Sequence, residues 1–269
     1  MSIMEDKTIL YSVRYPSAQE EGERIKVRGD RQAAEAKLTE FLRRMREERT
    51  YEPIPGREEK GRRFAALARE LGYLYVDTGA IYRTVALRAW EAGADPSDPE
   101  QIAPLLKGLD LRMDYGADGV QRMYLSGRDV TEAIRVHQIS GLASQVAALP
   151  PVRDFLLDFQ RRQAMEHDVV MDGRDIGTVV LPHAGAKVFL TAAPEARARR
   201  RLLELKQRGQ ETELETVLRD IVQRDEQDRN RAVAPLRQAE DAVLLDTTEL
   251  GLEESLKALI SLVKGRLAQ

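Results

Sequence analysis

The stretch GRRFAALARELGYLYVDTGAIYR, Gly61–Arg83, sets the secondary-structure pattern of the chain. Apolar residues recur at helical spacing from Phe64 to Leu71, and Gly72 follows at the point where a helix would end. The apolar segment YLYV at 73–76 has the length of a buried strand, and a second helix is predicted from about residue 80 to residue 90. Helix, strand and helix in this order indicate an α/β protein.

The same alternation continues toward the C-terminus. Three short segments with apolar centres are predicted strands: VVMDG at 169–173, KVFLT at 187–191 and AVLLD at 242–246. Helices separate them, and two more helices are predicted at about 139–148 and 151–166. This order predicts a parallel sheet covered by helices on both faces. The alternating pieces LDLRMDY and QRMYLSG, within 109–136, predict a small antiparallel insert.

The first 53 residues or so have a different pattern. TILYSVRY, Thr8–Tyr15, has the β-branched and aromatic content of a strand, and Asp30 can cap a helix that carries an apolar face. The following segment MREERTYEPIPGREEKG is highly charged and contains two prolines, so we expect a linker or an exposed loop.

Composition excludes several classes of protein. The chain has 269 residues, of which 42% are hydrophobic and 32% are charged, and it carries a net charge of -3. That near-neutral balance gives no electrostatic basis for binding nucleic acid or an anionic membrane. The absence of cysteine excludes disulfides and thiolate metal sites, and the three histidines are scattered. No apolar run approaches the roughly 20 residues of a membrane helix, so we expect a cytoplasmic protein.

Arginines and carboxylates gather directly after the predicted strands. Asp77 follows YLYV, while Arg174 and Asp175 follow VVMDG, and the later segment RDEQDRNR begins at Arg224. Ligands of open parallel sheets bind beyond the carboxyl ends of the strands, where converging guanidinium groups would bind phosphate. RDEQDRNR alone also fits a solvated helix face, and DTG alone fits a helix cap. The charged triplet GRD directly after an apolar strand favours a functional site.

Four long blocks carry a more specific signal. LGYLYVDTGAIYRTVAL, ASQVAALPPVR, MDGRDIGTVVLPHAGAKVFLTAAPEARARRR and RDEQDRNRAVAPLRQAEDAVLLDTTELGLEE resemble bacterial cytidylate kinase, in the same order and with natural spacing. The resemblance extends from about residue 61 to the C-terminus. It implies a P-loop-kinase-type fold and transfer of the γ-phosphate of ATP to CMP or dCMP, with Mg²⁺. The implied partners are small-molecule substrates alone, with no nucleic acid and no membrane, and we expect a monomer.

The resemblance also implies a domain layout. Residues 56–94 and 160–269 would form the kinase core, with a lid at about 197–215, and residues 95–159 would form the CMP-binding insert. Residues 1–55 would be an atypical N-terminal segment. No protein ligand to a metal is assigned. The implied site residues are, as catalytic groups, Lys60, Arg174, Arg200 and Arg231, and as substrate-binding groups, Asp77, Arg83, Ser144, Arg153, Asp175, Arg224 and Asp228.

Each of these residues has an implied role. Arg83 would hold the acceptor phosphate beside Asp77, Ser144 and Arg153 would contact cytosine, and Asp175 would accept a hydrogen bond from the cytosine amine. Arg174 would reach phosphate, Arg224 and Asp228 the sugar, and Arg231 the nucleotide or its phosphate. Arg197, Arg200 and Arg201 would belong to a lid that closes over ATP and excludes water. Uracil reverses part of the hydrogen-bonding pattern of cytosine and should be disfavoured.

The donor side departs from the family pattern. A P-loop has the form G-x-x-x-x-G-K followed by a hydroxyl residue, and no such motif occurs in the chain. Lys60 stands where the P-loop lysine belongs, but Arg62 stands where the hydroxyl residue would be, and the loop reads IPGREE. Glu58 and Glu59 would repel phosphate. Loss of the phosphate nest predicts impaired transfer, so the alternative function is a CMP-binding regulatory or interaction protein.

The strand that normally precedes a P-loop is also missing, because RTYEP is short, charged and ends at a proline. A gap in the middle of the sheet would leave backbone groups of two neighbouring strands unpaired. We therefore expect Thr8–Tyr15 to supply a strand, in the gap or at an edge. Three origins remain open for residues 1–60: a catalytic variant with a rebuilt donor site, a nucleotide-binding pseudoenzyme, or an altered start joined to a standard kinase body.

Overall fold

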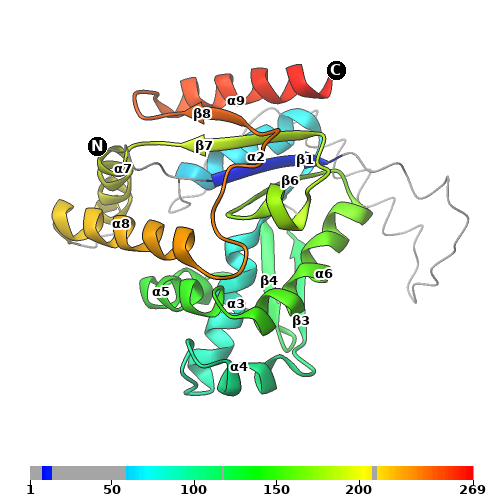
Figure 1. The fold of residues 1–269 in the computed structure, drawn as a ribbon, viewed down its shortest axis with the longest axis vertical. Helices are drawn as coiled ribbons and strands as arrows, with labels where there is room; N and C mark the ends of the chain where they lie inside the picture. Colours follow the sequence, from blue (N-terminus) through cyan, green and yellow to red (C-terminus); the bar gives the residue numbers. More distant parts are fainter. Residues whose placement is uncertain (1–7, 14–58, 117, 208–210, 269) are drawn as a thin grey trace, which may run out of the picture.

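The computed structural model describes residues 8–13, 59–116, 118–207 and 211–268. A five-stranded sheet lies at its centre (Figure 1), with the strands in this spatial order: β2 (Leu74–Asp77), β6 (Val169–Gly173), β1 (Thr8–Val13), β7 (Ala186–Thr191) and β8 (Val243–Asp246). The four strands that the sequence predicts after residue 61 are confirmed. They run parallel to one another, since β2 pairs in parallel with β6, β7 pairs in parallel with β8, and β1 is antiparallel to both β6 and β7.

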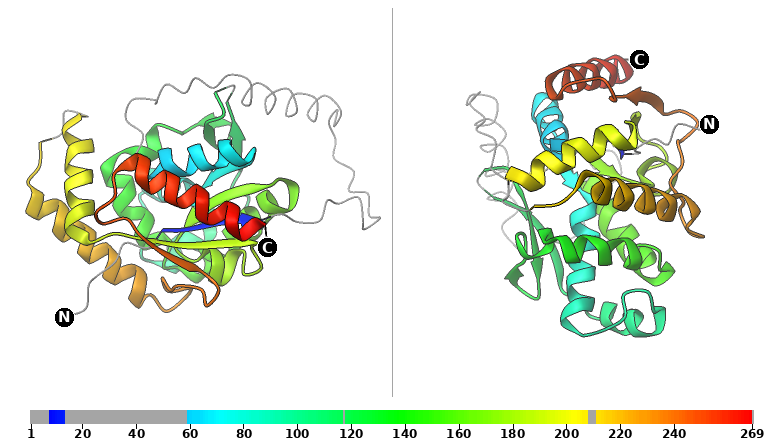
Figure 2. Two further views of the ribbon diagram at one scale, coloured as in Figure 1. Left: turned by 90° about the horizontal axis from the view of Figure 1, so that it is seen from above. Right: turned by 90° about the vertical axis from the view of Figure 1, so that its left-hand side faces the viewer.

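Helices cover both faces of this sheet, as the sequence predicts. Helices α2 (Glu59–Leu71) and α9 (Leu252–Leu267) pack on one face, as Figure 2 shows, against alternate residues of β6 and β7 such as Val170 and Val188. Met171 and Phe189 point to the opposite face. There α3 (Thr78–Glu91), α6 (Pro150–Glu166) and the one-turn π-helix η2 (Ile176–Val180) contribute to the larger apolar core. Burial on both faces explains why these strands read as continuous apolar runs.

Strand β1 confirms that an N-terminal segment fills the gap in the sheet. Residues Thr8–Val13 lie between β6 and β7 and pair with both, whereas Arg14 and Tyr15 lie outside the described residues. The direction of β1 corrects the expectation of a wholly parallel sheet. Thr8 pairs with Leu190 near the end of β7, and Val13 pairs with Val169 at the start of β6. The chain therefore leaves β1 at the amino ends of the parallel strands.

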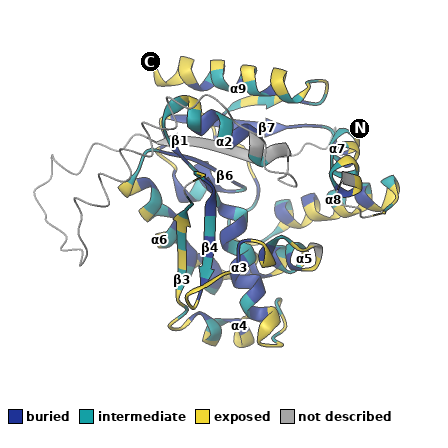
Figure 3. Ribbon diagram, turned by 180° about the vertical axis from the view of Figure 1, so that it is seen from behind, coloured by how far each residue is buried: buried dark blue, intermediate teal, exposed yellow. Residues whose placement is uncertain are grey.

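The predicted antiparallel insert is also confirmed. A second sheet contains β3 (Leu111–Tyr115), β4 (Gln121–Leu125) and β5 (Arg128–Asp129), in that order. Every second residue of β4 is buried, and Met123 and Leu125 belong to the same apolar core as α3. The insert is therefore packed against the rest of the chain and shares its core (Figure 3). Its remaining elements are α4 (Pro99–Leu106), the short 3-10 helix η1 (Ala133–Arg135) and α5 (His137–Val146).

The arginine-rich segment forms a helical hairpin of α7 (Pro194–Gln207) and α8 (Leu214–Asn230). Ala198, Leu205 and Val217 form a small apolar cluster between the two helices, separate from the two clusters that flank the sheet. The predicted helix capped by Asp30 and the charged segment MREERTYEPIPGREEKG up to Glu58 lie outside the described residues. The last three residues of that segment are not a loop as predicted, because α2 begins at Glu59. None of the helices within the described ranges is long and apolar enough to cross a membrane.

Candidate functional site

A cleft of about 890 Å³ opens at the carboxyl ends of β2, β6 and β7. Residues of α2, α3, β4, α5, α7 and α8 complete its walls, so that the body around the central sheet, the insert and the helical hairpin all contribute. Nine of the predicted site residues line it: Asp77, Arg83, Ser144, Arg174, Asp175, Arg200, Arg224, Asp228 and Arg231. The position agrees with the rule that open α/β sheets bind ligands beyond the carboxyl ends of their strands.

Asp77 aims Arg83 from the junction of β2 and α3. One carboxylate oxygen of Asp77 caps α3 by accepting a hydrogen bond from the Ala80 backbone N–H at 3.1 Å, and the other accepts one from Arg83 Nη2 at 2.8 Å. The Arg83 side chain is 13% exposed. A charge-assisted pair anchored to a helix cap restricts the guanidinium to one orientation, which suits a residue that binds a phosphate group.

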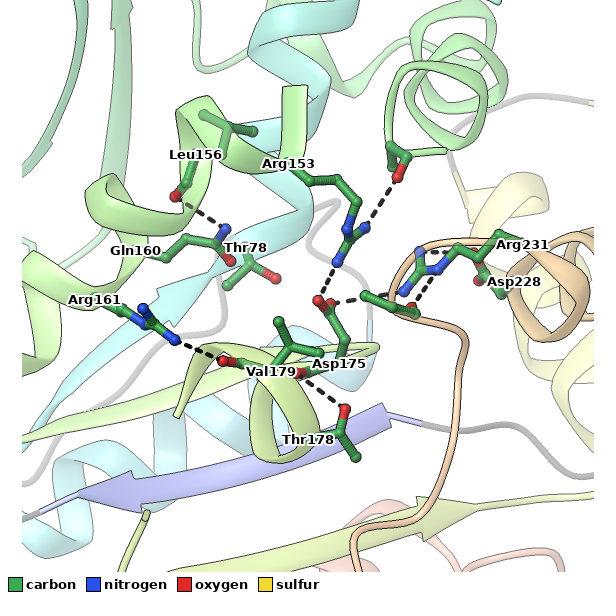
Figure 4. A network of polar contacts seen from close by, with 12 residues as sticks. Thr78, Arg153, Leu156, Gln160, Arg161, Asp175, Thr178, Val179, Asp228 and Arg231 are labelled. Carbon is green, nitrogen blue, oxygen red and sulfur yellow. Dashed lines mark hydrogen bonds and ion pairs between the residues drawn. The ribbon is translucent and has the colours of Figure 1, made fainter. Parts of the chain in front are cut away.

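The turn after β6 places Asp175 in the cleft. Thr78 Oγ1 donates a hydrogen bond to the Asp172 carbonyl at 2.6 Å, and a Cβ on Gly173 would lie 2.6 Å from that same hydroxyl oxygen. Only glycine fits so close an approach. Arg161 then donates to the carbonyls of Val179 and Val180 at 3.0 Å each, which fastens the π-helix η2 that follows (Figure 4).

Asp175 is buried between two arginines (Figure 4). Arg153 Nη2 donates a hydrogen bond to Asp175 Oδ2, and Arg231 Nη2 lies 3.7 Å from Asp175 Oδ1. Arg153 also donates to the Ala147 carbonyl, just beyond α5, at 2.9 Å. Arg153 contacts Asp175 but does not line the cleft. Its position therefore suits a residue that orients the Asp175 carboxylate. Its predicted contact with cytosine stays a prediction.

A second carboxylate extends the network toward α8. Asp228 Oδ2 accepts a hydrogen bond from Arg174 Nε at 2.9 Å, and Asp228 Oδ1 lies 3.6 Å from Arg231 Nη1. Burial raises the pKa of Asp228, but the nearby guanidinium groups of Arg174, Arg224 and Arg231 outweigh it, so the pKa lies below its ordinary value. Asp228 is therefore a carboxylate at neutral pH.

Several guanidinium groups gather around two carboxylates in this cluster. Arg153, Arg174 and Arg231 face Asp175 and Asp228, and Arg224 lies near Asp228. The pKa of Arg231 lies below its ordinary value, mainly because the side chain is buried and also because Arg153 is close to it. Arg231 Nη2 is buried and donates no hydrogen bond within the described residues. A buried cation with an available donor in a cleft is complementary to an anion such as phosphate.

Comparison with known proteins identifies the family. A family model described as cytidylate kinase matches residues 57–265. The chain belongs to the cytidylate kinase family. It is 48% identical to the cytidylate kinase of Desulfitobacterium hafniense (strain Y51) over 197 residues, which is 73% of this chain and 84% of that protein. It is 48% identical to the cytidylate kinase of Geobacter sp. (strain M21) over 204 residues, 76% of this chain and 87% of that protein.

A third relative extends the match. The cytidylate kinase of Pseudomonas syringae pv. tomato (strain DC3000) is 48% identical over 208 residues, 77% of this chain and 91% of that protein. The start of the family match at residue 57 agrees with the expected beginning of the resemblance near Gly61. Residues 8–13, which form the central strand β1, precede the matched region.

The three arginines that were predicted to belong to a lid line the cleft, but each already has a protein partner. Arg197 pairs with Asp225, and Arg201 pairs with Glu204 at 3.0 Å. Arg200 Nη2 donates to the backbone carbonyls of Thr247 at 2.5 Å and Leu250 at 3.1 Å. In this conformation Arg200 fastens α7 to the loop after β8. Its catalytic role stays a prediction that requires release from these carbonyls.

The donor-phosphate part of a cytidylate kinase site does not fit the residues present. Lys60 lies in the first turn of α2, but its side chain is outside the described part of the structure. Position 62 holds arginine, which offers no oxygen ligand. Among the described residues no group of three or more acidic or histidine side chains could hold a metal ion. A protein-built site for Mg²⁺ is therefore not formed by the described residues.

Several cleft residues were not singled out from the sequence. Asp172 belongs to the segment MDGRDIG but is not among the predicted site residues. It is buried at the end of β6 and accepts a hydrogen bond from Tyr75 Oη at 3.3 Å. Tyr82, next to Arg83, lies under Arg153 with its ring centroid 5.8 Å from the guanidinium carbon. Burial, together with Asp175, raises the pKa of Tyr82. Gln121 comes from the insert, and nothing in the sequence places it beside Asp77.

Proposed function

We propose that the cleft binds CMP or dCMP as the acceptor of a phosphoryl-transfer reaction, and that the reaction transfers the γ-phosphate of ATP to give CDP or dCDP. Membership of the cytidylate kinase family supports the reaction class. The buried network of Asp175, Asp228 and three arginines carries the proposal for the acceptor, because it brings a carboxylate and guanidinium groups together at one cleft.

The chemistry of the acceptor matches these groups. A carboxylate at Asp175 can accept a hydrogen bond from the exocyclic amine of cytosine, which uracil lacks. Arg83 and Arg231 can donate to phosphate oxygens, and Ser144 supplies a hydroxyl on the α5 wall. Arg153 orients the Asp175 carboxylate through a hydrogen bond without lining the cleft. ATP would supply the transferred phosphoryl group, and Mg²⁺ would neutralise charge on its phosphates.

A second candidate is a protein that binds CMP without phosphorylating it. The direction of β1 favours this candidate, because a P-loop follows the carboxyl end of a strand that is parallel to its neighbours. The carboxyl end of β1 lies at Val13, opposite Val169, on the side of the sheet away from the cleft. Strand β1 thus completes the sheet but cannot lead directly into a phosphate-binding loop at the cleft.

Calorimetry with CMP and with a non-hydrolysable ATP analogue, combined with a coupled assay for ADP release, separates the two candidates. Binding of both ligands with turnover at ordinary kinase rates supports the kinase and contradicts the second candidate. Binding of CMP without turnover supports the second candidate. A chain that binds no CMP would contradict both. Arg83→Ala is the matched variant, since it should weaken CMP binding by about tenfold or more through loss of a charge-assisted contact.

A further inference from the structure

The insert covers the free edge of the central sheet beside the cleft. Strand β2 is an edge strand, and the residues that alternate along it direct their backbone groups either toward β6 or away from it. Tyr75 and Asp77 direct theirs away. Tyr115 Oη, from β3, donates a hydrogen bond to the Tyr75 carbonyl at 3.0 Å. Gln121, from β4, binds the backbone of Asp77.

The side-chain amide of Gln121 pairs with both backbone groups of Asp77, as the backbone of a neighbouring strand would. Its Oε1 accepts a hydrogen bond from the Asp77 N–H at 2.7 Å, and its Nε2 donates to the Asp77 carbonyl at 3.2 Å. Gln121 is 4% exposed and lines the cleft. A buried side-chain amide that satisfies both backbone groups of one residue holds that residue in place, because breaking either bond would leave a polar group unpaired.

Asp77 in turn sets the position of the acceptor-site arginine. Its carboxylate caps α3 through Ala80 and accepts the hydrogen bond from Arg83 Nη2. A continuous chain of hydrogen bonds therefore extends from the insert sheet through Gln121 and Asp77 to Arg83. Every bond along it is between 2.7 and 3.2 Å.

We propose that Gln121 is a positioning residue for the phosphate of the nucleoside monophosphate. By fixing the Asp77 backbone it fixes the direction of the Arg83 guanidinium, and it couples the placement of the insert to phosphate binding. This inference rests on the proposed function, in which Arg83 binds the acceptor phosphate. Gln121 itself need not touch the ligand.

The test compares CMP with cytidine, which has the same base and sugar but no phosphate. Gln121→Met keeps the length of the side chain and removes both hydrogen bonds to Asp77. We expect it to weaken CMP binding about tenfold, the scale of one charge-assisted contact, while cytidine binding changes less than twofold. Isothermal calorimetry with the full chain measures both affinities, and the melting temperature shows that each variant is folded.

Tyr115→Phe is the matched control. It removes the hydrogen bond to the adjacent outward-facing residue of β2, so it disturbs the same edge contact without touching Asp77. We expect it to lower the melting temperature but to leave the affinities for CMP and cytidine unchanged. If Gln121→Met does not fold, Gln121→Leu also removes both hydrogen bonds without adding a charge, and the same loss specific to CMP is expected.

Three results would overturn the inference. The folded variant of Gln121 could bind CMP as tightly as the wild type does. It could instead lose affinity for CMP and cytidine equally. Finally, Tyr115→Phe could show the same loss of affinity for CMP alone. If the wild-type chain binds neither CMP nor cytidine, the proposed function is contradicted. If the wild type binds CMP and the Gln121 variant binds it equally well, only the inference about Gln121 is contradicted.

Discussion

Asp175 lies in the buried network at the cleft, and Arg153 binds its carboxylate directly. Both side chains are buried, with 5% and 7% of their surface exposed. Removing one partner of such a pair leaves a charge without compensation in a medium of low polarity, which is costly even where the intact pair contributes little. Arg231, at 3.7 Å, compensates Asp175 only in part.

We predict that Arg153→Ala lowers the free energy of unfolding by about 3 kcal/mol. Urea denaturation at neutral pH measures this change. Lys264→Ala is the control, since Lys264 pairs with Glu70 on the surface, with about half of each side chain exposed, and should change stability by less than about 1 kcal/mol. Equal, small losses in the two variants would contradict the burial argument.

The lowered pKa of Asp228 leads to a specific prediction for how the free energy of unfolding depends on pH. Its folded-state pKa lies below the ordinary value of 3.8, so the folded chain binds fewer protons than the unfolded chain as the pH falls toward that value. The stabilisation is fully present above the unfolded pKa and is lost as the pH falls through the folded pKa. Asp228→Asn removes it at every pH.

We therefore expect the stability difference between wild type and Asp228→Asn to be constant from pH 8 to about pH 5 and to shrink below it. Denaturation with urea at several pH values between 7 and 3 measures the difference. Asp154→Asn, an exposed carboxylate on α6, is measured alongside as the control. A difference that widens toward acid pH would show that the sign is wrong.

At the scale of elements, β1 matters most for the stability of the sheet, because it lies between two other strands. It pairs with β6 on one side and β7 on the other, so each N–H in its middle faces a neighbouring strand. Proline removes one of these donors and is tolerated in sheets chiefly at edges. The strand closes a gap of one strand's width, and without it two parallel strands would expose unpaired backbone groups.

We predict that Leu10→Pro destabilises the chain by at least about 2 kcal/mol, because a buried acceptor on a neighbouring strand is left unsatisfied. Leu10→Val, which keeps the N–H and has high strand propensity, should lose much less. Thermal unfolding followed by circular dichroism compares the two. If Leu10→Pro melts at the wild-type temperature, β1 is not part of the folded sheet.

At the scale of the whole molecule, the cleft joins three parts of the chain. The ends of β2 and β6, the insert through Gln121 and Ser144, and the hairpin through Arg224 and Asp228 all line it. A ligand that contacts all three binds only the assembled chain, and it stabilises the folded state in proportion to the logarithm of its concentration relative to Kd.

We predict that CMP at a concentration of about 100 times its Kd raises the melting temperature by about 5–10 °C, since it adds about 2.7 kcal/mol. UMP at the same concentration should give about half that shift or less, because its O4 carbonyl would face the Asp175 carboxylate. Differential scanning fluorimetry measures both. Equal shifts for CMP and UMP would contradict the assignment of Asp175 to the base.

Much of the fold could be predicted from the sequence because its signals are local. Apolar segments such as VVMDG mark strands buried on both faces, and Gly72 marks the end of α2 with a φ of 73°. The polar residues that line the cleft could be predicted because parallel strands all bring their carboxyl ends to one edge. Arg83, in the helix after β2, and Asp175, directly after β6, meet there for that reason.

The sequence alone determined that the chain is an α/β protein of this family, with arginines and carboxylates after its strands and without a P-loop motif, since these properties follow from residue types and their spacing. Only the tertiary structure decided the direction of β1, the place of Arg153 behind Asp175, and the contact of Gln121 with Asp77. Strand direction depends on pairing with segments more than 150 residues away. The contact of Gln121 depends on how the insert packs on an edge strand, and neither leaves a local pattern in the sequence.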